Sequence, residues 1–210
     1  GAVHISTSIT EQGQGTEAVM QQIAADQLGV KVDTVRVTHG DTDATPYGGG
    51  TWASRGVGIG GEAVLKASRK LKENILNIAA VIMQSEVNNL DVQNDQVIRK
   101  DGGKGISLKD LAQIVYYRGH ELPPGTNAEL IATASFSIEG VPFVFTNSAM
   151  GCLVDVDVDT GLTKIEKFWA VEDCGTQINP KLVEEQIRGG GVQGIGGALY
   201  EECIYDEMGN

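Results

Sequence analysis

The hydrophobic positions in the first part of the chain alternate between two spacings. Residues 1–9 place apolar side chains at every second position among threonines and serines, which predicts a strand. After a glycine turn, Thr16 is the expected N-cap of a helix with one apolar face, and Gly29 is expected to end that helix. Val35 and Val37 again alternate with polar neighbours. The pattern predicts a strand, a helix and a second short strand.

A long helix is predicted after the glycine-rich loop of residues 40–50. From about Gly61 the apolar positions keep a helical spacing, with lysines and glutamate on the other side. This predicted stripe consists of Val64, Ala67, Leu71, Ile75, Ile78 and Ile82. Residues 88–105 are polar and rich in turn formers, and no strand or helix is predicted there. Ser107 is expected to begin a short helix over residues 108–116.

The second half of the chain carries the pattern of a hairpin followed by a helix. Valines alternate with aspartates at residues 154–159, Gly161 turns the chain, and residues 165–171 return as the second strand. Asn179 is the expected N-cap of a helix that continues into a run of glycines. The pattern of residues 205–210 predicts a strand that enters a turn.

The order of these elements predicts the fold class and the organisation of the chain. Strands and helices are mixed without strict alternation, which predicts an α+β fold of mixed sheets with packed helices. Residues 1–87 and residues 131–210 contain the glycine-rich loops, so we expect two ligand-binding segments there. Residues 88–130 are expected to form a peripheral lobe segment. Because the first and last patterns resemble strands in mid-sheet, we expect a fragment or split part of a larger subunit.

Composition limits the partners that the chain can have. Its 210 residues, of which 41% are hydrophobic, suffice for a buried core. The net charge of −12 repels nucleic acid and anionic membrane surfaces, so neither is expected as a partner. No apolar run is long enough to span a bilayer. The cysteines lack C-x-x-C spacing, which argues against a disulfide framework or zinc site and fits a reducing cytoplasm; they are Cys152, Cys174 and Cys203.

Glycine is concentrated in three segments, residues 13–16, 48–61 and 189–197. Glycine destabilises regular elements by roughly 0.5–1 kcal/mol per position relative to alanine, so its clusters mark turns or close backbone approach to a ligand or another element. Close approach leaves backbone N–H groups free to bind phosphate, above all at helix starts. For one segment alone, tight packing is the simpler interpretation. Three such segments together favour a large anionic ligand.

Other motifs do not indicate sites. The glycines of residues 189–194 have the spacing of a dinucleotide fingerprint, but a helix enters them where that motif needs a strand. Residues 155–159 resemble a calcium loop, but the glycine comes one position late and the valines alternate as in a strand. The three histidines are scattered, and no nucleophile elbow or lysine-bearing phosphate loop is present. The residues therefore indicate ligand-binding loops without a general base.

Three blocks of sequence carry a family resemblance. The first is Thr-Glu-Gln-Gly-Gln-Gly-Thr-Glu at residues 10–17, and the second runs from Gly-Asp-Thr-Asp to Trp-Ala-Ser-Arg at residues 40–55. The third covers residues 171–180 and continues at residues 185–202. In this order and spacing they resemble the molybdopterin-binding large subunit of the xanthine dehydrogenase, aldehyde oxidase and carbon monoxide dehydrogenase family of molybdenum hydroxylases. Residues 88–129 carry the weakest resemblance.

The resemblance implies a molybdenum–molybdopterin cofactor in the cytosine dinucleotide form. Gln14 and Gln193 would hydrogen-bond near the molybdenum oxo ligands or the pterin, because an amide adds no charge beside an anionic cofactor. Arg55 would pair with phosphate oxygens in bidentate fashion, and the third block would line the cytidine end. The implied cofactor-binding residues are Gly13, Gln14, Gly15, Thr51, Ala53, Ser54, Arg55, Cys174, Gly175, Ile178, Asn179, Gln186 and Gln193.

Simpler roles stay open for some of these residues. Asn179 is also the helix cap, Cys174 is equally well a small buried side chain, and Arg55 could form a surface salt bridge. The family gives the metal no side-chain ligand, so no metal-binding residue is assigned. Its general base is a glutamate in a Gly-x-Gly-Glu motif that this sequence lacks, and Glu201 and Glu202 do not replace it. No catalytic residue is therefore assigned.

The resemblance also implies an activity and partners. It implies part of an enzyme that hydroxylates an aldehyde or N-heterocycle with oxygen from water and passes electrons to iron–sulfur and flavin partners. These partners would be the remainder of the subunit, an iron–sulfur subunit, an FAD subunit and a small-molecule substrate that the sequence does not identify. Two alternatives stay open: a catalytically silent cofactor-binding or subunit-interaction module, and an unrelated binder of phosphate ligands.

Overall fold

The computed structural model describes residues 2–140 and 145–210. They belong to two compact units, Gly1–Pro142 and Phe143–Asn210. Within the described residues, the first unit contains a parallel pair of strands, a three-stranded antiparallel sheet and three α-helices, and the second contains a hairpin and one helix. This mixture is the α+β class that the sequence predicts. Residues 88–130 lie in the first unit, and the assignment of ligand-binding and peripheral segments stays a prediction.

The first unit begins with a strand–helix–strand motif. β1 (Val3–Ser6) and β2 (Val35–Thr38) form a parallel pair in which Val3 lies opposite Val35. Parallel neighbours need a long crossover connection, and α1 (Thr16–Leu28) provides it, followed by the short η1 (Val32–Thr34). The predicted strand, helix and strand are therefore confirmed.

Both ends of α1 depend on glycines. Gly29 ends the helix with φ 72°, as predicted, and an added Cβ there would lie 2.0 Å from the Val92 carbonyl oxygen. The predicted N-cap is wrong. Gly15, with φ 83°, occupies that position, and Thr16 is already helical and 5% exposed. The Thr16 hydroxyl accepts a hydrogen bond from Gln14 Nε2 at 2.7 Å instead of capping the helix.

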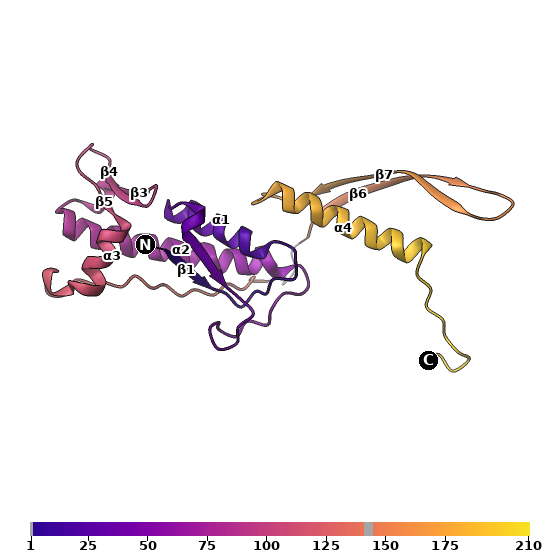
Figure 1. Cartoon of the computed structure of the whole chain (residues 1–210), viewed down its shortest axis with the longest axis horizontal. Coiled ribbons are helices and arrows are strands. Elements are labelled where there is room, and N and C mark those ends of the chain that lie inside the picture. Colours follow the sequence, from indigo (N-terminus) through magenta and orange to yellow (C-terminus); the bar gives the residue numbers. More distant parts are fainter. Residues whose placement is uncertain (1, 141–144) are drawn as a thin grey trace. The chain divides into compact units, whose positions relative to one another are not determined.

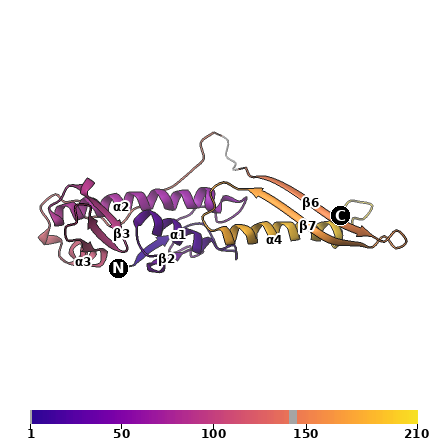
Figure 2. The ribbon, with the colours of Figure 1, turned by 90° about the horizontal axis from the view of Figure 1, so that it is seen from above.

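The main core of the first unit lies where α1 packs against α2 (Glu62–Met83). A π-helical turn, η2 (Gly56–Gly61), leads into α2. Figures 1 and 2 both show the two helices side by side. Met20 of α1 and Ile78 of α2 are each 0% exposed, which confirms the apolar face predicted for both helices. Burial of this face stabilises α2, since each fully buried aliphatic side chain contributes roughly 1.5–3 kcal/mol.

The polar, turn-rich residues 88–105 contain two strands that the sequence pattern did not predict. After η3 (Val87–Asn89), they form β3 (Leu90–Gln93) and β4 (Gln96–Arg99), and β5 (Ile106–Ser107) completes the antiparallel sheet. Leu90 and Val92 are 2% exposed and Val97 is 0% exposed. The loop residues Asn94 and Asp95 both have positive φ, which is the geometry of a two-residue hairpin turn that matches strand twist. The buried apolar residues of these strands are too few, among their polar neighbours, to produce a recognisable strand pattern in the sequence.

The remaining helix of the first unit confirms its predicted start. α3 (Leu108–Tyr117) is capped by Ser107, whose hydroxyl accepts the Asp110 backbone N–H at 3.0 Å. A short η4 (Gly119–Glu121) follows. An ion pair of 2.9 Å between Lys72 of α2 and Asp91 of β3 connects the long helix to the antiparallel sheet.

The second unit confirms the predicted hairpin and helix. β6 (Asn147–Val156) and β7 (Thr163–Asp173) pair in antiparallel fashion, and α4 (Pro180–Leu199) runs beside them in Figure 2. Asn179 caps α4, because its side-chain oxygen accepts the Leu182 N–H at 3.3 Å. The glycines of residues 189–197 lie inside this helix, which agrees with the conclusion from the sequence that they do not form a dinucleotide-binding loop. No strand forms over residues 205–210, where Asp206 instead accepts backbone N–H groups of a turn.

Among the helices of the described residues, none combines the length and apolar character that crossing a membrane would require.

Candidate functional site

The turn at residues 11–17 is closed by a side chain of its own. Glu11 Oε1 accepts the backbone N–H groups of Gly13 at 2.8 Å and Gly15 at 2.9 Å. Glu11 Oε2 accepts the N–H of Glu17, in the first turn of α1, at 3.1 Å. Partial burial acts to raise the pKa of Glu11, but these donors and the Gln12 N–H outweigh it and hold the pKa below its ordinary value. The turn therefore contains a built-in anion.

The predicted pterin-side residue Gln14 lies in this turn with its amide fully engaged. Its Oε1 accepts the Gln12 N–H at 2.6 Å. Its Nε2 donates to the Thr10 carbonyl at 3.2 Å and to the Thr16 hydroxyl at 2.7 Å. The amide is half-buried, and both of its ends point to groups of the same turn. Gln14 is consequently held in one orientation.

The turn is joined to the second predicted loop through two threonines. Thr51 Oγ1 accepts the Thr10 N–H at 3.0 Å and donates to the Thr10 carbonyl at 2.7 Å. Gln12 Nε2 also donates to the Thr51 carbonyl at 3.2 Å. The structure thereby joins the two segments that carry the predicted residues of the first unit, which are Gly13, Gln14 and Gly15 in one segment and Thr51, Ala53, Ser54 and Arg55 in the other.

The end of the second loop has an unusual backbone. Ala53 and Ser54 have φ of 48° and 57°, in the left-handed region that costs a non-glycine residue roughly 1–2 kcal/mol. Such conformations are enriched at functional sites. Both residues are exposed, so their backbone and the Ser54 hydroxyl are accessible to a ligand.

Arg55 follows these two residues and leaves one donor without a partner. Its guanidinium lies over the Trp52 ring, 5.4 Å from the centroid, and the Trp52 indole N–H donates to the Gly49 carbonyl at 3.1 Å. Arg55 Nε is buried and has no hydrogen-bond partner. A buried donor left unpaired costs about 1–3 kcal/mol, so this atom fits a site that an anionic group completes. No salt bridge of Arg55 is present among the described residues.

Two glycines of the second glycine-rich segment serve packing instead. An added Cβ at Gly60 would lie 2.4 Å from the Ile9 side chain, and one at Gly61 would lie 3.1 Å from Ile23. Both glycines are buried. Close packing of η2 onto the strand–helix motif therefore accounts for this part of the segment, and the ligand interpretation applies to residues 48–55.

The predicted residues of the second unit lie in the connection from β7 to α4 and on α4 itself. Cys174 is partly exposed, which disagrees with a fully buried role, and Gly175 takes φ 74° while its N–H donates to Asp173 at 3.0 Å. Ile178 is half-buried beside the cap Asn179. These residues therefore lie in the segment that leads into the first turn of α4.

The amides of α4 share one exposed face. Gln186, Gly190, Gln193 and Gly197 recur at helical spacing, and all four are exposed. The packed face is a different one, on which an added Cβ at Gly191 would lie 3.2 Å from the Phe168 ring of β7. The exposed face therefore presents two neutral amides separated by positions without side chains.

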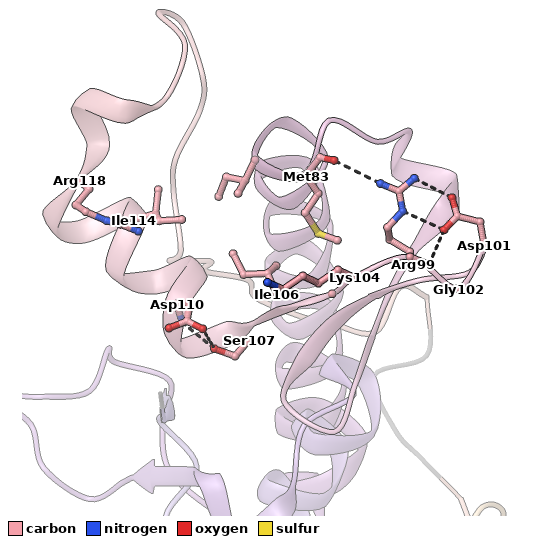
Figure 3. A pocket seen from close by; sticks show the side chains of 13 residues that line it. Met83, Arg99, Asp101, Gly102, Lys104, Ile106, Ser107, Asp110, Ile114 and Arg118 are labelled. Atoms are coloured by element: carbon pink, nitrogen blue, oxygen red, sulfur yellow. Dashed lines mark hydrogen bonds and ion pairs between the residues drawn. The ribbon is translucent and has the colours of Figure 1, made fainter.

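An open groove of about 930 Å³ lies elsewhere in the first unit, and none of the predicted residues lines it. Figure 3 shows Arg99 and Asp101 turned toward one another beside Met83. Arg99 donates to Asp101 at 2.8 and 3.0 Å, and this pairing, with donors from Asn89 and Gly103, holds the pKa of Asp101 well below its usual range.

The groove is a weaker candidate than the loops because most of its charged side chains already have partners within the chain. Arg118 pairs with Glu121 at 3.7 Å, and Asp110 accepts the Ser107 hydroxyl at 2.6 Å. In the described part of the chain, the buried side-chain atoms without a partner are Arg55 Nε and Asn74 Nδ2, and neither residue lines the groove. We therefore place the candidate site at the loops.

Sequence reasoning missed the residues that hold the site in shape. The hydrogen bonds of the two loops are made by Glu11, Thr10, Gln12 and Trp52. All four lie within the first two blocks of sequence that carry the family resemblance. The acidic residue two positions before the first glycine was the available signal for Glu11. No three His, Cys, Asp or Glu side chains of the described residues gather in a group that could hold a metal ion.

Comparison with known proteins gives a match over the whole chain. The family profile described as "Molybdopterin cofactor-binding domain" matches residues 1–210. The nicotine 6-hydroxylase large subunit of Paenarthrobacter nicotinovorans is 34% identical over 218 residues, which cover 100% of this chain and 26% of that protein. The carbon monoxide dehydrogenase large chain of Hydrogenophaga pseudoflava is 35% identical over 199 residues, 95% of this chain and 24% of that protein.

A solved structure is also similar. Quinoline 2-oxidoreductase from Pseudomonas putida 86 matches with a TM-score of 0.89 and 37% identity, covering 100% of this chain and 26% of the matched chain. The chain thus spans about a quarter of the length of the relatives that it matches. The likeness covers the folds of the loops, hairpin and helices described above.

Proposed function

Because the chain belongs to the molybdopterin cofactor-binding domain family of molybdenum hydroxylase large subunits, we propose that it holds a molybdenum–molybdopterin cofactor in the cytosine dinucleotide form. The residues of the first unit, together with Gln193 of the second, would bind the pterin and phosphate part, and the other predicted residues of the second unit would bind the cytidine part. The observation that carries this proposal is the buried Arg55 Nε, a guanidinium donor without a partner at a position where the family resemblance expects a phosphate.

Each group of residues would contribute a different interaction. Arg55 would pair with phosphate oxygens, and the exposed Ser54 hydroxyl and the backbone at Ala53 would bind beside it. Gln14 and Gln193 would contact the pterin or the oxo ligands through neutral amides. The cytidine part would be lined by Cys174, Gly175, Ile178, Asn179 and Gln186.

The reaction belongs to the complete enzyme. The bound cofactor would supply the redox chemistry by which an aldehyde or N-heterocycle gains oxygen from water and gives up two electrons and two protons. Iron–sulfur and FAD partners would accept the electrons, in line with the relatives' names as large subunits and large chains. A reducing cytoplasm, favoured by the three free cysteines, is part of the proposal.

This chain would contribute binding and orientation to that reaction. The Gly-x-Gly-Glu motif of the family's general base is absent from the sequence, and the chain spans about a quarter of its relatives. By itself, the chain would therefore be a catalytically silent cofactor-binding module, which is the alternative that the sequence left open.

The test is cofactor analysis of the complete polypeptide that carries this sequence, purified gently with its copurifying subunits. We expect near-stoichiometric molybdenum by mass spectrometry, together with an equal amount of CMP released on acid hydrolysis. Molybdenum without CMP would overturn the dinucleotide form only. An intact complex that contains neither would overturn the proposal.

A further inference from the structure

The first glycine turn does not offer its backbone donors to a ligand. Clusters of backbone N–H groups at a helix start bind phosphate readily, and the Gly13–Thr16 segment has this geometry. Here the N–H groups of Gly13, Gly15 and Glu17 all donate to the Glu11 carboxylate, at 2.8 to 3.1 Å. Three backbone donors that a phosphate could use are therefore occupied from within the chain.

The internal carboxylate also opposes an external anion by its charge. Its pKa lies below the ordinary value, because the backbone donors outweigh burial, so Glu11 is ionised at neutral pH. A phosphate approaching the turn would meet a like charge, and it would compete with the Glu11 carboxylate for the N–H groups of Gly13, Gly15 and Glu17. Beside the second glycine-rich loop of the same unit, a buried donor without a hydrogen-bond partner lies on Arg55 instead.

The closed turn fixes the one neutral amide that it carries. Gln14 bonds to the Gln12 N–H, the Thr10 carbonyl and the Thr16 hydroxyl, and these residues flank the donors that Glu11 holds. Opening the turn would release the backbone on both sides of Gln14. The orientation of this amide thus depends on a carboxylate three positions before it.

We propose that Glu11 is a positioning residue, a fixed internal anion that disfavours phosphate binding at the glycine turn and keeps the Gln14 amide in one orientation at the cofactor site. The part concerning the cofactor rests on the function proposed above. The exclusion of phosphate rests only on the contacts of this chain. The glycine turn and Arg55 accordingly have opposite roles, because the turn holds a fixed carboxylate beside a neutral amide and Arg55 would bind the anion.

The first experiment measures cofactor retention in the complete polypeptide with its partners. Glu11→Gln keeps the size of the side chain but removes its charge and replaces one acceptor oxygen with a donor. Glu17→Gln, an exposed residue in the first turn of the same helix, is the matched control. We expect E11Q to lose bound molybdenum at least fivefold faster than wild type during dialysis at pH 7, and E17Q to match wild type. Equal retention by all three would overturn the positioning role.

The pH profile gives a readout specific to the Glu11 charge. Because the folded pKa of Glu11 is lowered, its contribution is complete above the ordinary value of about 4.3 and is lost as the pH falls through the folded pKa. The difference in retention between E17Q and E11Q should therefore shrink as the pH falls from 5 to about 3. A difference that stays constant over this range would contradict a role of the charge.

The second experiment uses inorganic phosphate and needs no molybdenum. On cofactor-free complete polypeptide, phosphorus NMR titration of Glu11→Ala should detect a phosphate site at least tenfold tighter than any in wild type. Glu11→Asp, which keeps an internal carboxylate, should behave as wild type. If E11A binds phosphate no better than wild type, exclusion is wrong. If wild type lacks molybdenum in its native complex while E11A gains phosphate binding, the proposed function fails and exclusion stands.

Discussion

Thr51 forms two hydrogen bonds with one residue, Thr10, in opposite directions. Its hydroxyl accepts the Thr10 N–H at 3.0 Å and donates to the Thr10 carbonyl at 2.7 Å. A side chain forty-one positions away thus replaces the backbone pairing that a neighbouring strand would give. This bond pair connects the glycine turn before α1 to the loop that ends at Arg55.

Thr51→Val should loosen that connection without changing the shape of the side chain. Both backbone groups of Thr10 lose a partner, although the carbonyl keeps Gln14 Nε2, so we expect about 1–2 kcal/mol of local destabilisation. Hydrogen exchange of peptides covering residues 10–17 would measure it. Thr51→Ser keeps the hydroxyl and is the control. Unchanged exchange in T51V would show that the loops are held together by other contacts.

Arg55→Gln should weaken retention of the cofactor. A charge-assisted bond to phosphate is worth about 1.5–3 kcal/mol, which corresponds to roughly tenfold or more faster loss of molybdenum and CMP. Arg69 is an exposed arginine of α2 that donates to Gln27 at 3.1 Å, so Arg69→Gln is the matched loss of charge. If both variants retain the cofactor equally, Arg55 does not bind the phosphates.

The Asp91–Lys72 ion pair should make stability depend on acid pH. The pKa of Asp91 is lowered mainly by the hydrogen bond from Lys72, against the effect of burial. Its stabilising contribution is therefore complete above the ordinary value of about 3.9 and lost as the pH falls through the folded pKa. In Asp91→Asn, the midpoint of urea unfolding should depend less on pH between about pH 5 and pH 2 than it does in wild type. Asp43→Asn, in an exposed loop, should keep the wild-type slope.

Ile78→Ala should destabilise the first unit by about 2–5 kcal/mol, because the side chain is 0% exposed and its removal leaves a cavity. Hydrogen exchange of the α2 amides, measured by mass spectrometry, would report this loss of stability. Val158→Ala removes a side chain that is 92% exposed and should change stability by no more than about 0.5 kcal/mol. Comparable effects of the two changes would contradict the described core.

Gly190→Ala should separate the two possible reasons for glycine in α4. Within its unit, an added Cβ meets nothing within 4 Å, so alanine should favour the helix by about 1 kcal/mol. If the face with Gln186 and Gln193 is approached closely in the complete enzyme, the same change should reduce bound cofactor. Gly191→Ala, which would place a Cβ 3.2 Å from the Phe168 ring, should stabilise the helix less than Gly190→Ala. Full cofactor content in G190A would show that this face needs no close approach.

The sequence predicted elements wherever the hydrophobic period was long. The predicted stripe of α2 runs from Val64 to Ile82, which is about five helical turns, so the existence of the helix followed from spacing alone. The hairpin of β3 and β4 escaped because each strand has four residues and the turn is Asn94–Asp95, which lacks the glycine that usually marks such turns. Short strands are specified by burial of two or three side chains, and burial is a tertiary property.

The candidate site was predictable in its positions but not in its bonding. The repeated short polar residues and glycines indicated which loops to consider, and the resemblance supplied their roles. That Glu11, and not a phosphate, receives the N–H groups of the turn depends on a side-chain rotamer that no local pattern specifies. The same holds for Arg55 Nε, whose lack of a partner follows from how Trp52 and the preceding loop cover it.

The close approach of Gly29 to Val92 has a consequence for how the first unit opens. With a Cβ only 2.0 Å from the Val92 carbonyl, no other residue fits where α1 ends against β3. Asp95 completes the joint, since its carboxylate accepts the Lys31 N–H at 3.1 Å. We therefore expect the antiparallel sheet and the strand–helix motif to open together as one cooperative unit, so that their amides lose protection from hydrogen exchange at the same time. A lengthened β3–β4 hairpin should therefore first disturb the C-terminal end of α1, at Gly29.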